Sequence, residues 1–236
     1  MSVSPVVPAS PMLPRRALLT APWAAVLVGL PGVAVALSNT DAAAGVRAAL
    51  ERGALAAVGL LGRADGFLGN EKVRIPLPGQ LDRAAKLLRS LGQRQRIDEL
   101  VTAMNRAAEA AVPEAKDLLV QAVKTISVQD ALGLVRGGDR AVTDFFAART
   151  REPLTGRFLP IVTRATEKVK LADRYNDFAG KAQGLGLVKA QDANLQSYVT
   201  GKTLDGLYWM IGEEERKIRA DPVGTGSALL RQVFGR

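Results

Sequence analysis

Only one segment of this chain alternates apolar and polar residues with the period of two that is typical of a β-strand. It runs from Glu71 to Pro78, where Val73, Ile75 and Leu77 alternate with Lys72, Arg74 and Pro76. Pro76 and Pro78 have no backbone N–H to donate to a sheet ladder, so the segment cannot serve as an internal strand. We therefore expect residues 71–78 to form an extended arm that lies over helices.

Elsewhere the apolar residues recur at strides of three and four, which is the spacing of a buried helical face. The three clearest stripes are Val46, Leu50, Ala54, Ala57 and Leu61; Ile97, Leu100, Val101, Met104, Ala108 and Ala111; and Leu195, Val199, Leu204, Leu207, Ile211 and Ile218. The sequence predicts an all-α fold, a single multi-helix bundle domain with one short extended proline-containing arm.

Particular residues indicate where the helices begin, end or carry charge. Pro113 is expected to kink a helix or to open a new one, and Pro153 and Pro160 are expected to separate helices. Ser127 and Asp139 have the residue type and position of N-caps. The last long helix, from about Asn194 to Arg219, is expected to carry ion pairs at its exposed end: Glu213 with Lys217, and Glu215 with Arg219.

Residues 1–36 have the composition of a secretory signal peptide. Arg15 and Arg16 precede an uncharged stretch over residues 17–40, and Ala34 and Ala36 give the small-x-small pattern of a signal-peptidase site. We expect cleavage after Ala36. The paired arginines are similar to a twin-arginine export signal, while Pro14 and Thr20 depart from its usual pattern. General secretion therefore remains the alternative route.

Two other interpretations of the N-terminus stay open. Residues 17–40 are long enough to span a bilayer as an uncleaved anchor, although two prolines and two glycines interrupt a helix there. Met12 is a second possible start. A lipoprotein anchor would need a cysteine at the cleavage point, and the chain has none. We expect residues 37–236 to form a single domain, exported to the periplasm or envelope, with no membrane-spanning segment after cleavage.

The chain contains no histidine and no cysteine. This excludes imidazole bases, thiolate nucleophiles, disulfides, and zinc, haem or iron–sulfur centres that use His or Cys ligands. Carboxylates are the remaining acid–base candidates, and Glu109 and Glu114 lie on either side of Pro113. Di-metal carboxylate bundles normally also use Glu-x-x-His motifs. We expect no catalytic residue, no metal and no cofactor, with a carboxylate-based hydrolase or metal-dependent enzyme as the alternative.

Asn105 lies at the edge of an apolar stripe, with Glu109 one helical turn further on. A buried Asn or Glu needs hydrogen-bond partners, and Arg106 or the pair Tyr175–Asn176 could supply them. One interpretation is a structural network between helices, and the other is a polar handle inside an apolar pocket. The candidate binding residues are Asn105, Arg106, Glu109, Glu114, Tyr175 and Asn176.

The net charge of +9 raises the question of an acidic partner. The densest basic stretch contains Arg83, Lys86, Arg89, Arg94 and Arg96. Binding of single-stranded nucleic acid would need stacking aromatics among these residues, and no aromatic lies between Phe67 and Phe145. This argues against nucleic acid. An apolar or anionic envelope ligand, a lipid surface or a protein partner fits an exported protein better, and a merely solubilising surface is the alternative.

Several segments together resemble the bacterial domain-of-unknown-function family numbered 4197. They are residues 66–70, 73–78, 104–116, 158–162, 175–176, 204–207 and 213–219. They appear in the expected order over nearly all of the chain after the leader. The resemblance implies an exported helical bacterial protein and supplies neither an activity nor catalytic residues. The sequence therefore predicts a non-enzymatic binding or interaction protein of the periplasm or envelope.

Overall fold

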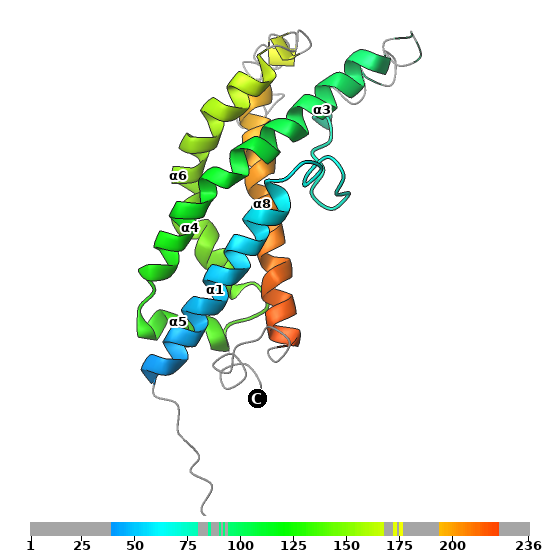
Figure 1. Ribbon diagram of the computed structural model, residues 1–236. Coiled ribbons are helices and arrows are strands. Elements are labelled where there is room, and N and C mark those ends of the chain that lie inside the picture. Colours follow the sequence, from blue (N-terminus) through cyan, green and yellow to red (C-terminus); the bar gives the residue numbers. More distant parts are fainter. Residues whose placement is uncertain are drawn as a thin grey trace, which may run out of the picture. The chain divides into compact units, whose positions relative to one another are not determined.

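The computed structural model describes residues 39–79, 85, 90, 92, 94–167, 172–173, 175–176 and 194–221. These residues form helices and no strand, which confirms the all-α fold (Figure 1). The helices are α1 (Asn39–Leu61), α3 (Arg94–Ala111), the short 3-10 helix η1 (Val112–Glu114), α4 (Ala115–Lys124), α5 (Val128–Arg136), α6 (Ala141–Thr166) and α8 (Leu195–Ala220). The expected signal peptide lies outside the described residues.

The core is built around α8, which packs against α1, α3 and α6. Helix α6 also packs against α3 and α4, and α1 packs against α4 and α5. The largest fully buried side chains are Phe67, Phe146, Phe158, Leu61, Ile75, Ile97, Leu100, Met104, Leu119, Ile126, Leu154 and Leu195. Full burial of one such side chain contributes about 2 kcal/mol. Three of them come from outside the helices. Ile126 lies between α4 and α5, whereas Phe67 and Ile75 belong to the segment that follows α1, so the core includes that segment.

Residues 62–78, the segment drawn in cyan after α1 in Figure 1, contain the expected extended arm. Turns occupy residues 62–69 and 71–73, and residues 74–78 have no regular secondary structure. Val73, Ile75 and Leu77 are buried, whereas Arg74 and Pro76 are exposed. The period of two is therefore real, and the arm packs its apolar face on helices rather than on a sheet.

The prolines of α6 do not divide it, contrary to the sequence-based expectation. Pro153 and Pro160 both lie inside the continuous helix Ala141–Thr166. Both are exposed, so the carbonyl groups that each proline leaves without an N–H partner can be hydrated. Buried side chains on the opposite face hold the helix together: Phe146, Leu154, Phe158 and Val162. Tertiary packing has overridden a local breaker here.

The junctions between helices follow the sequence in part. Pro113 lies in η1, between α3 and α4, as its position before a new helix suggested. Ser127 is the N-cap of α5, where it forms a capping box with Asp130. Asp139, in contrast, does not cap α6: the N-cap residue is Arg140, and its side chain makes no capping hydrogen bond. Glu215 of α8 accepts hydrogen bonds from the first amides of α6 instead.

Substitution of glycine by alanine is expected to have opposite effects on the free energy of unfolding at two helical positions. A Cβ at Gly53 in α1 would lie 3.6 Å from Glu214 Cβ and 3.7 Å from Ile218 Cδ1, which is ordinary contact. A Cβ at Gly206 in α8 would lie 2.7 Å from Cε1 of the buried Phe67 ring. Gly53→Ala should raise the free energy of unfolding by about 1 kcal/mol, because alanine is the better helix former.

Gly206→Ala should lower the free energy of unfolding by about 1–2 kcal/mol, because overpacking outweighs the same gain in helix propensity. Urea unfolding followed by circular dichroism measures both variants. Equal effects of the two substitutions would contradict this account of the packing between α8 and Phe67.

Candidate functional site

Asn105 of α3 pairs with the backbone of the arm as a neighbouring strand would. Its Oδ1 accepts a hydrogen bond from the Ile75 N–H at 2.8 Å, and its Nδ2 donates to the Ile75 carbonyl at 3.0 Å. Nδ2 also donates to the Val101 carbonyl at 2.8 Å. Asn105 is 0% exposed. One side chain therefore satisfies both backbone groups of a buried residue that has no sheet partner.

Glu109, one turn along α3, binds the other end of the same segment. Its Oε1 accepts hydrogen bonds from the backbone N–H groups of Phe67 at 3.0 Å and Leu68 at 3.1 Å. Its Oε2 accepts from Arg106 Nη1 at 2.6 Å. Glu109 is 4% exposed, so these partners compensate the burial of its charge.

Arg106 joins this carboxylate to a second one in the turn. Its Nη2 donates to Asp65 Oδ1 at 2.8 Å, and Asp65 has a φ of 63°, in the left-handed region that Asp tolerates better than most residues. The hydrogen bonds to Glu109 and then to Asp65 raise the pKa of Arg106 above its ordinary value. The arm is also fixed from α8, since the Tyr198 hydroxyl donates to the Pro76 carbonyl at 3.1 Å.

The structure brings three of the six candidate residues together and separates the others. Asn105, Arg106 and Glu109 act on one segment, whereas Glu114 is exposed in η1. Asn176 contacts the first residues of α8: its side chain accepts a hydrogen bond from the Leu195 N–H at 2.7 Å and donates one to Gln196 Oε1 at 3.0 Å. Tyr175 is buried. The hydrogen bonds of Asn105 that the described residues show go to Ile75 and Val101, and this geometry is that of a structural network.

The remaining candidates from the sequence are exposed or outside the described residues. Arg94 and Arg96, at the start of α3, are exposed. The side chains of Arg83, Lys86 and Arg89, and the export residues Arg15, Arg16, Ala34 and Ala36, lie outside the described part of the chain.

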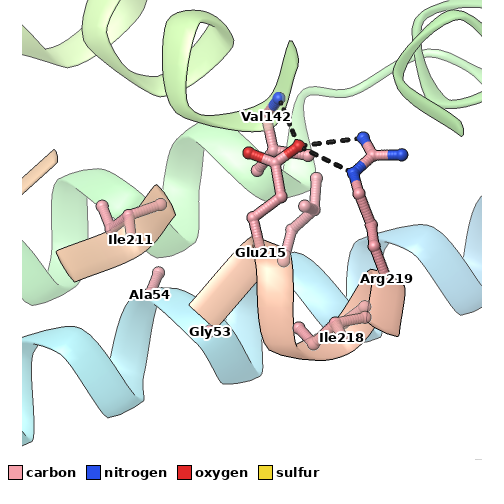
Figure 2. A pocket seen from close by; sticks show the side chains of 9 residues that line it. Gly53, Ala54, Val142, Ile211, Glu215, Ile218 and Arg219 are labelled. Carbon is pink, nitrogen blue, oxygen red and sulfur yellow. Dashed lines mark hydrogen bonds and ion pairs between the residues drawn. The ribbon is translucent and has the colours of Figure 1, made fainter. Parts of the chain in front are cut away.

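A second buried network lies at the C-terminal end of α8, where the sequence predicted an exposed ion pair. Glu215 accepts from the Val142 N–H at 3.2 Å, and from the Thr143 N–H at 3.1 Å and hydroxyl at 3.0 Å. Arg219 donates to Glu215 Oε1 at 2.8 Å (Figure 2). It also donates to the Leu134 carbonyl at 2.9 Å. The pair thus holds the N-terminus of α6 and the C-terminal turn of α5, where its charges complement the helix dipoles.

One signal in the sequence could have located this network. Glu215 follows Ile211 by four residues and precedes Ile218 by three, so it lies on the apolar stripe itself. The apolar notch beside it is lined by Ala49, Gly53 and Ile218, among others (Figure 2). It has a volume of about 20 Å³, enough for about one water molecule. This site is structural and has no room for a ligand.

A larger groove lies between α6 and α8, with a volume of about 640 Å³, within the range of small-molecule sites. Its lining residues are Arg151, Thr155 and Leu159 from α6, and Ser197, Tyr198, Thr200, Gly201, Lys202, Leu204 and Asp205 from α8. Leu159 is 37% exposed and is the exposed large hydrophobic side chain of the described residues. The groove therefore combines charged groups, hydroxyls and an apolar contact.

Tyr208 lies beneath Arg151, next to this groove. The Arg151 guanidinium carbon is 5.3 Å from the centre of the Tyr208 ring, and the Tyr208 hydroxyl shares a hydrogen bond of 2.8 Å with Thr150. Burial raises the pKa of Tyr208 above its ordinary value, against the smaller opposing effects of Thr150 and Arg151. The phenol is therefore neutral near pH 7, and Arg151 rests on an uncharged ring.

The described residues contain no group of three or more acidic side chains placed to hold a metal ion. Among those same residues, no helix is both long and apolar enough to cross a membrane. The fold and its two buried networks thus define a helical protein whose core includes a pinned extended segment.

The family model described as "Protein of unknown function (DUF4197)" matches residues 36–235. The chain belongs to this family, which confirms the resemblance found in its sequence motifs. No curated protein and no solved structure matches the chain.

The two polar side chains that hold the 62–78 segment should be essential for its order. Asn105→Ala and Glu109→Ala should each lower the free energy of unfolding by about 2–4 kcal/mol, because buried backbone groups lose their partners. Trypsin cleavage after the exposed Lys72 and Arg74 should become faster, since the arm is released locally.

Glu114→Ala is the matched control for these two variants, because Glu114 is an exposed acid in the adjoining turn. It should change the free energy of unfolding by less than about 0.5 kcal/mol. Urea unfolding and timed trypsin digestion provide the measurements. Wild-type stability and wild-type cleavage of Asn105→Ala or Glu109→Ala would contradict the role given to that residue.

Proposed function

We propose that this chain is an exported, non-enzymatic binding protein of the bacterial periplasm or envelope. The observation that carries the proposal is the groove between α6 and α8. It has a volume of about 640 Å³, and its described lining residues include two cationic side chains and one anionic side chain. Arg151 and Lys202 face one carboxylate there, that of Asp205. A ligand with apolar and anionic parts would complement these groups.

Support for export comes from the sequence. Residues 1–36 carry a charged start, an uncharged middle and the small-x-small pattern that ends at Ala36. The family model begins at residue 36, which is where the leader is expected to end. The family match and the proposed leader therefore overlap only at residue 36.

The alternative of carboxylate-based catalysis has no support from the described geometry. Among the described residues, the hydrogen bonds of the Glu109 carboxylate go to Phe67, Leu68 and Arg106, and Glu114 is exposed. These two acids do not face each other across a cleft, so they lack the arrangement that paired acid–base chemistry needs.

Native mass spectrometry of the protein, expressed in a bacterium and recovered from the periplasm, tests export and binding together. We expect the mass of residues 37–236 plus a further mass that solvent extraction removes. Uncleaved protein confined to the cytoplasm would contradict export. A bare mass in the periplasmic sample would contradict a ligand held tightly in the cell and favour a protein partner or a structural role.

A conservative variant of the leader separates the two export routes. Arg15→Lys combined with Arg16→Lys keeps both charges but removes the arginine pair. Uncleaved precursor in the cytoplasm is the result expected for twin-arginine export, whereas general secretion would leave cleavage unchanged.

A further inference from the structure

We propose that the α6–α8 groove binds an amphiphile with a single apolar chain and one oxyanion head group, such as a carboxylate. This inference rests on the proposed function and assigns a ligand class to it. In this arrangement Arg151 and Lys202 hold the head group, and the chain lies toward Leu159. Three observations carry it: the charge of the groove, its unused hydrogen-bond donors and its open apolar end.

The charged residues of the groove leave one positive charge unbalanced. Arg151 Nη2 donates to Asp205 Oδ1 at 2.8 Å, and Lys202 Nζ lies 3.8 Å from Asp205 Oδ2. The two cations thus share one carboxylate, and among the described residues no other acidic side chain lines the groove. Their side chains are 47% and 45% exposed, so a ligand can reach both. An anion would restore neutrality at this point.

Hydrogen-bond donors are in excess as well. A guanidinium has five N–H donors, and Arg151 uses one of them for Asp205. The Lys202–Asp205 distance of 3.8 Å is too long for a hydrogen bond. Within the described part of the chain, the ammonium group thus makes an ion pair with Asp205 and lies 6.0 Å from the centre of the Tyr198 ring, and neither contact is a hydrogen bond. Its N–H donors remain available to a ligand. A carboxylate or phosphate oxygen is the acceptor that such a pair of cations favours.

Thr200 adds an unsatisfied polar atom among the lining residues. It is 1% exposed, and its hydroxyl makes no hydrogen bond to any described residue. Thr203, on the same helix, shows the usual solution, in which the hydroxyl donates to the carbonyl four residues earlier at 2.7 Å. Native proteins pair nearly all buried polar atoms, so an unpaired hydroxyl on a residue of a groove that two cations also line indicates a missing acceptor.

The apolar end of the groove distinguishes an amphiphile from a small inorganic anion. Leu159 is 37% exposed on α6, and Leu204 and Tyr198 line the opposite wall on α8. A Cβ built at Gly201 would meet no atom within 4 Å, so the floor of the groove is open there. A free anion would leave this part of the groove empty, whereas a hydrocarbon chain would bury Leu159.

Isothermal titration calorimetry of the full-length purified protein with octanoate, below its micelle concentration, tests the proposal. Octanoate should bind, whereas octanol and octylammonium should bind at least about fivefold more weakly, because they lack the anionic head group. Acetate should also bind more weakly, because it lacks the chain. Equal binding of octanol, equal binding of acetate, or no binding of octanoate would each overturn the proposal.

Variants that each remove one positive charge test whether octanoate binds in this groove. Arg151→Gln and Lys202→Gln should each weaken octanoate binding at least about fivefold. Arg157→Gln is the matched control, since Arg157 is an exposed arginine of α6 that does not line the groove. A loss of affinity in Arg157→Gln equal to that in Arg151→Gln would show a general effect of net charge and overturn the assignment.

Two further variants, Gly201→Leu and Thr200→Val, test the groove without a change of charge, and Gly156→Leu is the control. Gly201→Leu should fill the groove and remove binding, while Gly156→Leu, at an equally open position outside the groove, should not. Thr200→Val should weaken binding and raise the melting temperature of the free protein, because it removes an unpaired buried hydroxyl. Unchanged affinity in Gly201→Leu would exclude the groove.

The experiments distinguish a failure of the proposed function from a failure of the proposed ligand class. A removable mass in the native spectrum, together with no binding of octanoate, would leave the protein a binding protein and reject the ligand class. Binding of octanoate that depends on Arg151 and Lys202, with a bare native spectrum, would support the groove as an oxyanion site and contradict a tightly held ligand in the cell.

Discussion

A segment without regular secondary structure can lie in a helical core only if its backbone N–H and carbonyl groups find partners. The 62–78 segment meets this condition through α3. Asn105 binds both backbone groups of Ile75, and Glu109 binds the amides of Phe67 and Leu68. With these groups paired, the side chains of Phe67 and Ile75 can be buried fully. The packing of α8 at Gly206 against Phe67 depends in turn on that position.

The same principle operates at the other buried network. Glu215 supplies the hydrogen bonds that the N-cap residue of α6 does not make, and Arg219 binds a carbonyl in the last turn of α5. In both places a helix face that is mostly apolar carries one or two polar side chains, and these bind backbone groups that no regular structure satisfies. The buried residues Asn105, Glu109 and Glu215 thus fix connections between helices, while the groove between α6 and α8 retains charged groups with unused hydrogen-bond donors.

The helical architecture and the arm could be predicted because both depend on local periodicity. The polar cluster around Asn105 could also be located, since a polar residue at the edge of an apolar stripe needs partners. Its partner segment could not be identified, because Ile75 lies 30 residues away in the sequence. The expectation that Pro153 and Pro160 separate helices was wrong, because the long-range packing of α6 outweighs the free-energy cost of a proline inside a helix. The groove depends on the pairing of α6 with α8, which no local pattern encodes.

Amide hydrogen exchange at Phe67, Leu68 and Ile75 is the most direct test of the pinned segment. The account predicts slow exchange at all three amides in the full chain, although none of them lies in a helix. Glu109→Ala should accelerate exchange at Phe67 and Leu68, and Asn105→Ala should accelerate it at Ile75. Exchange in the wild-type protein as fast as that of an exposed loop would contradict the account.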